Sequence, residues 1–258
     1  MKDILHIVYC PFTGLGIKEF GGQQWFDYRE KIFKQYTLAS LQNQIDKDFI
    51  LWLSFRPEEK DNPTIKKIAQ AIQKTDIKSI FTFDGVMIYD DRGVWHNQDL
   101  EERMLRSLEF IKSQVEPANW VFKTDLGSDD MFSTEALAET KQEKPRERGA
   151  AYYLNGYILN MNTGQVADWN RETSCSKYTI MYPYDVFFDA KKHLEYVKGL
   201  NSHEFVPLVF DATRLPDKRY MCGVHGANIS TTWNNPERGK EYSGEEKDKI
   251  LKQFGISL

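Results

Sequence analysis

Three aspartates fall close together in the stretch "WVFKTDLGSDDMFS" (residues 120–133). Asp125 ends an apolar-leaning run, and Asp129 and Asp130 follow it across a turn that contains Gly127. Carboxylates held this close repel one another unless a cation or hydrogen-bond donors offset their charge. A hard divalent ion such as Mg²⁺ or Mn²⁺, bound by oxygen ligands, would offset it and would in turn bind phosphate oxygens.

A turn without any ligand is the alternative interpretation of this stretch. Asp and Ser are common in turns because their side chains hydrogen-bond to the local backbone. Such a turn would cap a helix that begins near Ser133 or Thr134. The spacing alone leaves both interpretations open.

A second candidate ligand, His225, lies in "GVHGANIS" with Gly223 and Gly226 on either side. Glycine lets the backbone approach a ligand closely, and an imidazole can join a Mn²⁺ site or hydrogen-bond to a phosphate. The alternative is an ordinary loop histidine. Arg29 and Arg56 would point toward the same edge as the aspartates if the strands are parallel; each would otherwise be a surface cation.

Strand and helix patterns alternate from residue 4 to residue 125. The apolar spacing predicts strands over residues 4–10, 49–55, 78–85 and 119–125, and helices over residues 25–41, 63–74 and 99–114. This alternation is typical of a parallel α/β sheet. Ligands of open α/β sheets bind outside the carboxyl ends of the strands, where the aspartate turn and the glycine-rich loop "GLGIKEFGG" (residues 14–22) are expected. That loop is neither G-x-G-x-x-G nor a P-loop.

The second half of the chain has a different pattern. The charged segment at residues 141–149 looks flexible, and residues 150–170 read as paired strands with turns at Asn155-Gly156 and at residues 162–164. A helix is expected near residues 186–199, and a strand entering a loop within residues 219–231. Ser243, with Glu246 three residues on, predicts a capping box at the start of a terminal helix.

The composition places the chain among globular proteins. Of its 258 residues 41% are hydrophobic and 28% charged, and 34 Lys and Arg against 38 Asp and Glu give a net charge of -4. No overall basic field is present to hold nucleic acid. Three cysteines without a C-x-x-C pair indicate free thiols in a reducing compartment. No apolar run near the start approaches the roughly 20 residues that span a bilayer, so we expect no transmembrane segment and a cytoplasmic location, with peripheral membrane association left open.

Three stretches together resemble rhamnosyltransferases and related glycosyltransferases with the GT-A fold. They are "WFDYREKIFKQYTLASLQNQIDKDFILWLSF" (residues 25–55), "FKTDLGSDDMFS" (residues 122–133) and "VHGANIS" (residues 224–230). The resemblance implies a GT-A-like α/β fold: a Rossmann-type, mostly parallel central sheet flanked by helices, with a mixed or antiparallel C-terminal half. We therefore expect one domain over residues 1–258. Its nucleotide-binding half would end near residue 133, and its acceptor-side half would cover residues 134–258.

The same resemblance implies a nucleotide-diphosphate sugar donor and a Mn²⁺ or Mg²⁺ ion that bridges the diphosphate. Asp129 and Asp130 match the last two acids of the family's metal turn, and His225 would join them as a metal ligand. Gly127 stands where the first acid of that turn belongs, and Asp125 could replace it only if the turn is rearranged. Donor-binding residues expected besides Asp125 are Arg29, Arg56 and Ser128.

These features predict a metal-dependent transferase of polysaccharide biosynthesis that moves a sugar, rhamnose among the candidates, to a glycan or other hydroxyl acceptor. A metal ion would offset the charge that develops on the diphosphate. An inverting enzyme also needs a base for the acceptor hydroxyl. The candidates are Asp185 and His203, and Asp185 has a helix N-cap as its alternative role.

Two rival functions remain open at this point. One is a non-catalytic sugar-nucleotide or glycan-binding module on the same scaffold, whose metal turn has decayed at Gly127. The other is a phosphoryl-transfer or hydrolase enzyme with Asp125 as nucleophile. It is disfavoured because "DLGSDD" lacks the usual aspartate two residues after such a nucleophile.

Overall fold

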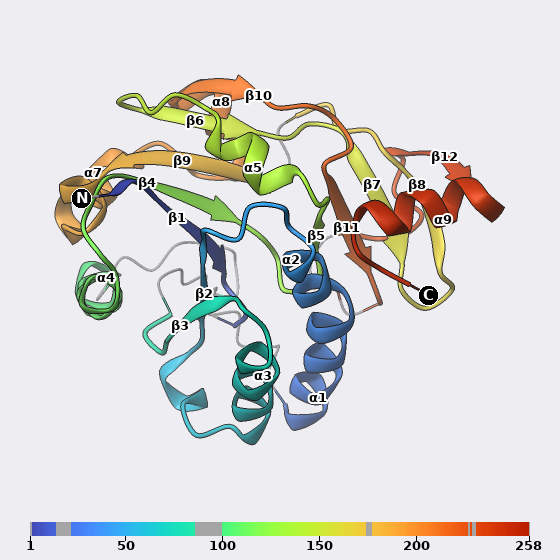
Figure 1. Cartoon of the computed structure of the whole chain (residues 1–258), viewed down its shortest axis with the longest axis horizontal. Coiled ribbons are helices and arrows are strands. Elements are labelled where there is room, and N and C mark those ends of the chain that lie inside the picture. The colour runs from blue at the N-terminus through green and yellow to red at the C-terminus, as the bar shows by residue number, and fades with distance from the viewer. Residues whose placement is uncertain are drawn as a thin grey trace.

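A seven-stranded sheet forms the centre of the protein (Figure 1). The computed structural model describes residues 2–13, 22–85, 100–173, 177–226, 228 and 231–257. In spatial order the strands are β10 (Asp211–Arg214), β6 (Gly149–Tyr152), β9 (Tyr178–Pro183), β4 (Ala118–Asp125), β1 (Lys2–Cys10), β2 (Ile50–Ser54) and β3 (Lys78–Thr82). β9 is antiparallel to both of its neighbours, and the other pairings are parallel.

The strand order reverses at β1. The chain passes from β1 to β2 and β3 on one side and then returns to place β4 on the other side of β1. Tyr9 is paired with Asp125 where both strands end, so the turn after β4 begins at this reversal. In open α/β sheets such a switch point leaves a crevice outside the carboxyl ends of the strands.

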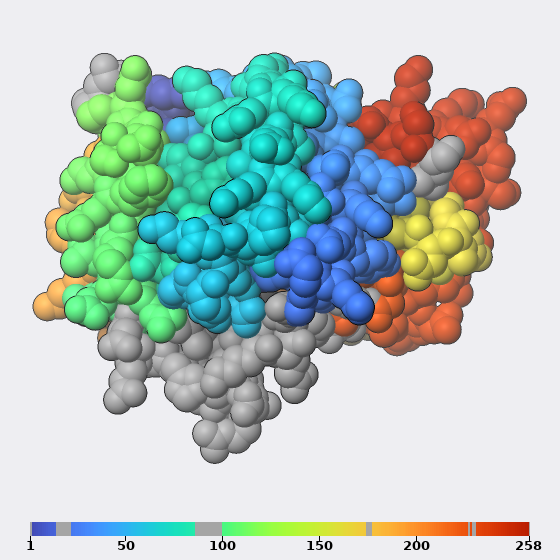
Figure 2. All heavy atoms as spheres, turned by 90° about the horizontal axis from the view of Figure 1, so that it is seen from below, coloured from blue at the N-terminus to red at the C-terminus, as the bar shows by residue number. Residues whose placement is uncertain are grey.

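Helices cover both faces of this sheet because its strands are apolar on both sides. One face packs against α1 (Gln23–Ile32), the π-helix η1 (Phe33–Leu38), α2 (Ala39–Gln42) and α3 (Pro63–Gln73). The other packs against α4 (Leu100–Gln114), α6 (Tyr184–Phe187) and α7 (Ala190–Tyr196). Seen from below in Figure 2, α4, α3 and α1 lie in a row, with the β7–β8 hairpin of the second sheet beyond α1.

Local sequence signals explain where α3 forms. Pro63 occupies its first turn, and the side chain of Asn62 caps it by accepting a hydrogen bond from the backbone N–H of Thr64, 2.8 Å away. Ile65 and Ile68 then recur at helical spacing and are buried against the sheet. The helix therefore begins where the sequence predicts it.

A second sheet has five strands and packs against the terminal helix α9 (Gly244–Gln253). Its order is β12 (Arg238–Tyr242), β8 (Gln165–Trp169), β7 (Gly156–Asn160), β11 (Tyr220–Val224) and β5 (Met131–Phe132). β5 follows the aspartate turn directly and pairs antiparallel with β11. This pairing brings the end of β11 beside the turn.

The remaining short helices lie between strands. They are η2 (Pro57–Glu59), α5 (Ala136–Lys141), η3 (His203–Phe205) and α8 (Val206–Val209). No helix in the described part of the chain has both the length and the apolar character that a membrane crossing requires.

The expected mostly parallel α/β sheet flanked by helices is confirmed, and four details differ. The Asn155-Gly156 turn does not join paired strands, because β6 pairs with β9 and β10 whereas β7 pairs with β8 and β11. The expected helix near residues 186–199 is two short helices, α6 and α7. Ser243 is the N-cap of α9, but its side chain makes no cap hydrogen bond. The charged segment at residues 141–149 looks flexible in sequence, but Arg146 within it donates a hydrogen bond to Asp211 at 2.8 Å.

The proposed halves of the chain share the large sheet, since β6, β9 and β10 all come from the second half. Of the cysteines, Cys10 is a buried free thiol and Cys222 is buried 3.9 Å from the Lys177 ammonium. Cys175 and residues 14–21 of the glycine-rich loop lie outside the described residues.

Candidate functional site

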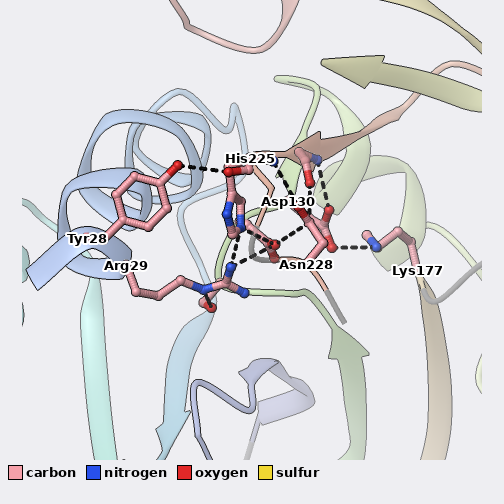
Figure 3. A network of polar contacts seen from close by, with 9 residues as sticks. Tyr28, Arg29, Asp130, Lys177, His225 and Asn228 are labelled. Carbon is pink, nitrogen blue, oxygen red and sulfur yellow. Dashed lines mark hydrogen bonds and ion pairs between the residues drawn. The ribbon is translucent and has the colours of Figure 1, made fainter. Parts of the chain in front are cut away.

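The aspartate turn connects the large sheet to the second sheet. Its backbone is closed by a hydrogen bond from the N–H of Asp130 to the carbonyl of Gly127, 3.2 Å away. The two adjacent carboxylates, on Asp129 and Asp130, have different cationic partners (Figure 3). Their mutual repulsion is therefore offset within the protein.

Asp129 is held by side chains from two distant segments. Its Oδ2 lies 2.9 Å from Nη1 of Arg29, a residue of α1, and accepts a hydrogen bond from Nδ2 of Asn228 at 3.0 Å. Nε2 of His225 is 3.1 Å from the same oxygen. Nε of Arg29 also donates to Oγ of Ser128 at 2.9 Å, so the guanidinium contacts the turn at both Ser128 and Asp129.

The charge state of Asp129 follows from these contacts. Burial raises the pKa of its carboxyl, but the Arg29 guanidinium and His225 outweigh burial and lower the pKa to about 2. Asp129 is therefore a carboxylate at neutral pH. The two charges of an ion pair this buried depend on each other, because removing either one leaves the other unpaired in a poorly solvated place.

Asp130 turns toward the opposite side. Its Oδ2 lies 2.6 Å from Nζ of Lys177, and its Oδ1 accepts a hydrogen bond from the N–H of Gly223 at 3.2 Å. The Lys177 side chain is only 1% exposed. Burial raises the pKa of the Asp130 carboxyl and Lys177 opposes this effect, while the neighbouring Asp129 charge adds to it.

His225 is placed by the end of β11. Its carbonyl accepts a hydrogen bond from the Tyr28 hydroxyl at 3.1 Å, and its N–H donates to Oδ1 of Asn228 at 2.8 Å. Nε2 of its ring contacts both Arg29 and Asp129. A protonated Nε2 donates to Asp129, whereas an unprotonated Nε2 accepts from Arg29, so the ring can satisfy only one of the two at a time.

Gly127 stands where an acid was expected, and the structure gives a steric reason for glycine. A Cβ added at Gly127 would overlap a carboxylate oxygen of Asp130 and lie 3.1 Å from Oδ1 of Asp129. The space of the missing side chain is thus filled by the carboxylate that reaches Lys177. A side chain at position 127 is incompatible with the present position of Asp130.

Asp125 is the last residue of β4, and its side chain pairs with a residue of the same strand and not with the network around Asp129. Its Oδ2 is 2.7 Å from Nζ of Lys123, two residues earlier on the same strand. Burial raises the pKa of the Asp125 carboxyl, and Lys123 and Lys177 both oppose this effect. Asp125 thus neighbours the Asp129–Asp130 network without replacing the acid missing at Gly127.

Arg56 lies at the carboxyl end of β2, as expected, but it is engaged locally. Its Nε donates to Oε1 of Glu59 at 2.6 Å, and its backbone N–H donates to the other carboxylate oxygen of Glu59 at 3.0 Å. Thr13, after β1, also donates to Glu59. Glu59 of η2 therefore accepts hydrogen bonds both from Arg56, after β2, and from Thr13, after β1.

The expected base Asp185 lies at the far end of β4 from the aspartate turn. β9 runs antiparallel to β4, so Pro183 pairs with Trp120 near the start of β4. Asp185 follows in the first turn of α6, is 72% exposed, and lies 3.3 Å from Nζ of Lys192. Pro183, not Asp185, is the N-cap of that helix.

The other expected base, His203, begins η3. The next residue, Glu204, accepts a hydrogen bond from Thr173 at 3.3 Å and lies 3.6 Å from Arg171. These contacts place η3 beside residues 171–173. The structure brings neither Asp185 nor His203 into the described contacts around Asp129, and the base stays a prediction.

The residues expected to hold Mn²⁺ or Mg²⁺ do not fit such an ion in this arrangement. Oδ2 of Asp129 is already contacted by three donor groups, and both oxygens of Asp130 have partners. Within the described residues, no group of three or more His, Cys, Asp or Glu side chains is placed to hold a metal ion. The charge argument for a metal assumed carboxylates without cationic partners, whereas Arg29 and Lys177 pair with them. The metal ion that the resemblance implies stays a prediction.

Three members of the network escaped the sequence analysis. Asn228 lies three residues after His225 in the stretch "VHGANIS", so the sequence alone places the two residues close together. Tyr28 precedes Arg29 within the helix expected over residues 25–41, and nothing in its local sequence distinguishes it from the other aromatic residues there. Lys177 follows no recognisable motif, and its pairing with Asp130 depends on β9 lying beside β4.

The comparisons with known proteins identify no family. No protein-family profile matches the chain, and no curated protein matches it. Among solved structures it is similar to TarS 1-349 from S. aureus, alone and in complex with UDP, at 13% identity and TM-scores of 0.43 and 0.42. These likenesses cover 86% and 87% of this chain but 60% and 61% of the TarS chains, so the chain spans less than two thirds of their length.

The chain is also similar to the inositol-1-phosphate CTP transferase from T. maritima, at 10% identity and a TM-score of 0.40. That likeness covers 100% of this chain and 98% of the other.

Proposed function

We propose that the protein is a glycosyltransferase that moves a sugar from a nucleotide-diphosphate donor to a hydroxyl acceptor. One observation carries the proposal: the three stretches that resemble GT-A glycosyltransferases meet in a single polar network. Arg29 comes from the first stretch, Asp129 from the second and His225 from the third. Arg29 and His225 are 196 residues apart in the chain, so the contact is made by the fold.

The place of the network supports a ligand site. It lies beyond the carboxyl end of β4, next to β1, where the strand order reverses. Ligands of open α/β folds bind at this position because the loops diverge there and leave a crevice. The network therefore lies where a sugar nucleotide would be expected.

Arg29 is the residue we assign to the diphosphate. A guanidinium presents a planar fork of donors that matches two phosphate oxygens, and its charge is kept at any physiological pH. Ser128 and Asp129 hold this fork in one orientation, and the side chain is 12% exposed. Cationic donors fixed in this way stabilise the negative charge that develops on a leaving diphosphate.

The reaction breaks the bond between the anomeric carbon of the sugar and the diphosphate oxygen. The acceptor oxygen forms the new bond to that carbon, its proton passes to a base, and the bonding pair leaves with the nucleotide diphosphate. Asp129 and His225 position Arg29 in this scheme. Within this reaction class the sequence resemblance favours a rhamnosyl donor and a glycan acceptor.

The test is release of nucleotide diphosphate from a panel of nucleotide sugars by the purified protein. We expect the wild type to hydrolyse or transfer from at least one donor, and Arg29→Met to lose about 100-fold in rate, as when one fixed donor to a developing negative charge is removed. Arg238→Met, on the edge strand β12, is the control that keeps full activity. Circular dichroism of each variant confirms that it is folded.

Two results would overturn the proposal. Wild-type protein that binds a nucleotide sugar in calorimetry without ever releasing the diphosphate would identify a non-catalytic binding module. Equal rates for folded Arg29→Met and wild type would show that the network around Asp129 does not serve the donor.

A further inference from the structure

Asp125 is a carboxylate at the carboxyl edge of the large sheet to which the proposed function assigns no role. It ends β4, and the N–H of the next residue, Leu126, donates to the carbonyl of Tyr9 in β1 at 2.9 Å. The Asp125 side chain is 13% exposed, and that of Arg29 is 12% exposed. The carboxylate is therefore fixed at the strand-order reversal and is as accessible as the residue that we assign to the diphosphate.

One oxygen of the Asp125 carboxylate is engaged and the other is not. Oδ2 accepts a hydrogen bond from Nζ of Lys123 at 2.7 Å. Among the residues that the structure describes, no donor contacts Oδ1. A carboxylate that is oriented through one oxygen and has lone pairs on the other can accept a proton from a hydroxyl group.

The two carboxylates of the aspartate turn are less suited to accept a proton. Both oxygens of Asp130 have partners, which are Lys177 and the N–H of Gly223. The pKa of Asp129 is lowered to about 2, so its carboxylate binds a proton only weakly at neutral pH. A general base is inefficient when its pKa lies far below the working pH.

The carboxylates that follow β2 and β3 are also engaged. Glu59 accepts hydrogen bonds from Arg56 through both of its oxygens. Both oxygens of Asp84 accept hydrogen bonds from side chains of α4, at 2.7 and 3.4 Å. Asp125 therefore combines two properties that none of these four carboxylates combines: an oxygen without a contact and a pKa that is not lowered.

The surroundings of Asp125 favour the uptake of a proton. Burial raises the pKa of its carboxyl above the ordinary value, and the charges of Lys123 and Lys177 oppose this effect without cancelling it. The carboxylate is thus a stronger base than an exposed aspartate.

The other ionisable groups near the Lys123–Asp125 pair come from the neighbouring strands and helices. Burial raises the pKa of Tyr9 in β1 and of Tyr182 in β9, and the charge of Asp125 adds to this effect, so both phenols are neutral at pH 7. Glu101 of α4 and Lys198, after α7, line the cavity that Lys123 also lines. The charges that lower the pKa of Asp125 are those of the two lysines.

The donor network lies around the same strand end as Asp125. Three residues separate Asp125 from Asp129, so their Cα atoms are at most about 15 Å apart. The charges of Asp125, Asp129 and Arg29 all influence the pKa of the buried Cys10 thiol at the end of β1. An acceptor hydroxyl at Asp125 is therefore near a donor sugar whose diphosphate binds Arg29.

We infer that Asp125 is the general base of the transferase and that the reaction inverts the anomeric configuration of the sugar. The inference rests on the proposed function. Oδ1 of Asp125 takes the proton of the acceptor hydroxyl while the acceptor oxygen attacks the anomeric carbon from the side opposite to the diphosphate. The bond from that carbon to the diphosphate oxygen breaks, and its electron pair leaves with the nucleotide diphosphate. Lys123 is a positioning residue that orients the carboxylate through Oδ2.

Kinetics of Asp125→Asn with the donor that the wild type cleaves tests the inference. We expect kcat to fall at least about 100-fold, as when a general base is removed. The dissociation constant of the nucleoside diphosphate, measured by calorimetry, should not change, because Asp125 does not contact Arg29. Asp3→Asn is the matched control and keeps full activity, because Asp3 is exposed at the start of β1, at the opposite end of the sheet.

The pH dependence separates a base from a merely structural residue. In the wild type, kcat/KM should fall at low pH as Asp125 takes up a proton, and this acid limb should be absent in Asp125→Asn. Lys123→Met removes a charge that lowers the pKa of Asp125, so its acid limb should move to higher pH. An acid limb that does not move in Lys123→Met would contradict the inference even if Asp125→Asn fails to fold.

The remaining outcomes separate this inference from the proposed function. Unchanged kcat in folded Asp125→Asn, or retained anomeric configuration in NMR of the first-formed product, would overturn Asp125 as the base and leave the transferase proposal intact. Loss of kcat in Asp185→Asn or His203→Asn, but not in Asp125→Asn, would return the role to a base expected from the sequence. Wild-type protein that never releases the diphosphate would overturn the proposed function and the base together.

Discussion

Nη1 of Arg29 lies 2.9 Å from Oδ2 of Asp129, and both side chains are nearly buried, at 12% and 11% exposure. The pair joins the first helix to the turn after β4 and lies at the strand-order reversal. A charge in this position is stable only with its partner, because neither group is well solvated. We therefore expect the Arg29–Asp129 ion pair to affect the stability of the protein as well as ligand binding.

The first prediction concerns the stability that Arg29 contributes. Arg29→Met keeps most of the side-chain length but leaves the Asp129 carboxylate without its cation. We expect the free energy of unfolding in urea at pH 7 to fall by about 3–5 kcal/mol, the range for breaking a buried pair. Lys240→Met, which breaks the exposed pair with Glu246, should cause no measurable change. Equal unfolding curves for Arg29→Met and wild type would show that the buried pair is not stabilising.

The second prediction concerns pH. The pKa of Asp129 in the folded protein is about 2, against an ordinary value of 3.8, so its charged form is favoured by folding. This contribution is fully present above about pH 4 and is lost as the pH falls through 2. The stability difference between wild type and Asp129→Asn should shrink by about 2 kcal/mol between pH 5 and pH 2, since one pKa unit corresponds to about 1.4 kcal/mol.

Chemical denaturation at several pH values measures this difference. Asp185→Asn is the control, because it replaces an aspartate that is 72% exposed on the surface and lies outside the network around Asp129. A wild-type-to-Asp129→Asn difference that stays constant from pH 5 to pH 2 would contradict the lowered pKa.

The third prediction concerns Gly127. A side chain there must displace the Asp130 carboxylate from Lys177, since an added Cβ overlaps it. We expect Gly127→Ser to lower the free energy of unfolding by about 1–3 kcal/mol, as overpacking does in a tight site. The matched control is Gly22→Ser, because a Cβ at Gly22 meets nothing within 4 Å. Wild-type stability in Gly127→Ser would mean that Asp130 has another low-energy position.

The fourth prediction concerns metal binding by the protein alone. Because Arg29 and Lys177 already offset Asp129 and Asp130, Mn²⁺ would have to displace both cations before coordinating the turn. We expect the electron paramagnetic resonance signal of free Mn²⁺ to be unchanged by one equivalent of the protein. Stoichiometric loss of the signal that Asp129→Asn abolishes would instead restore the metal site expected from the sequence.

Local patterns predicted much of the fold because they act over short distances. Pro63 and the apolar spacing of Ile65 and Ile68 place α3 whatever surrounds it. The Asn155-Gly156 turn shows where this reasoning ends. Its composition is that of a hairpin, but β6 pairs with β9 and β10 whereas β7 pairs with β8 and β11, so the two strands that it joins do not pair with each other. Strand partners depend on the whole sheet, so local turn chemistry could not identify them.

The candidate site divides in the same way. The sequence by itself determined that Asp129 and Asp130 follow a buried strand of an α/β sheet and that Arg29 lies on the first helix, because residue type and periodicity are local properties. Only the tertiary structure decided that Arg29 and Lys177 face the two carboxylates, and that Asp130 fills the space beside Gly127. The physical reason is that charge compensation and close packing are made by groups far apart in the chain, and their distances exist only once the sheets have assembled.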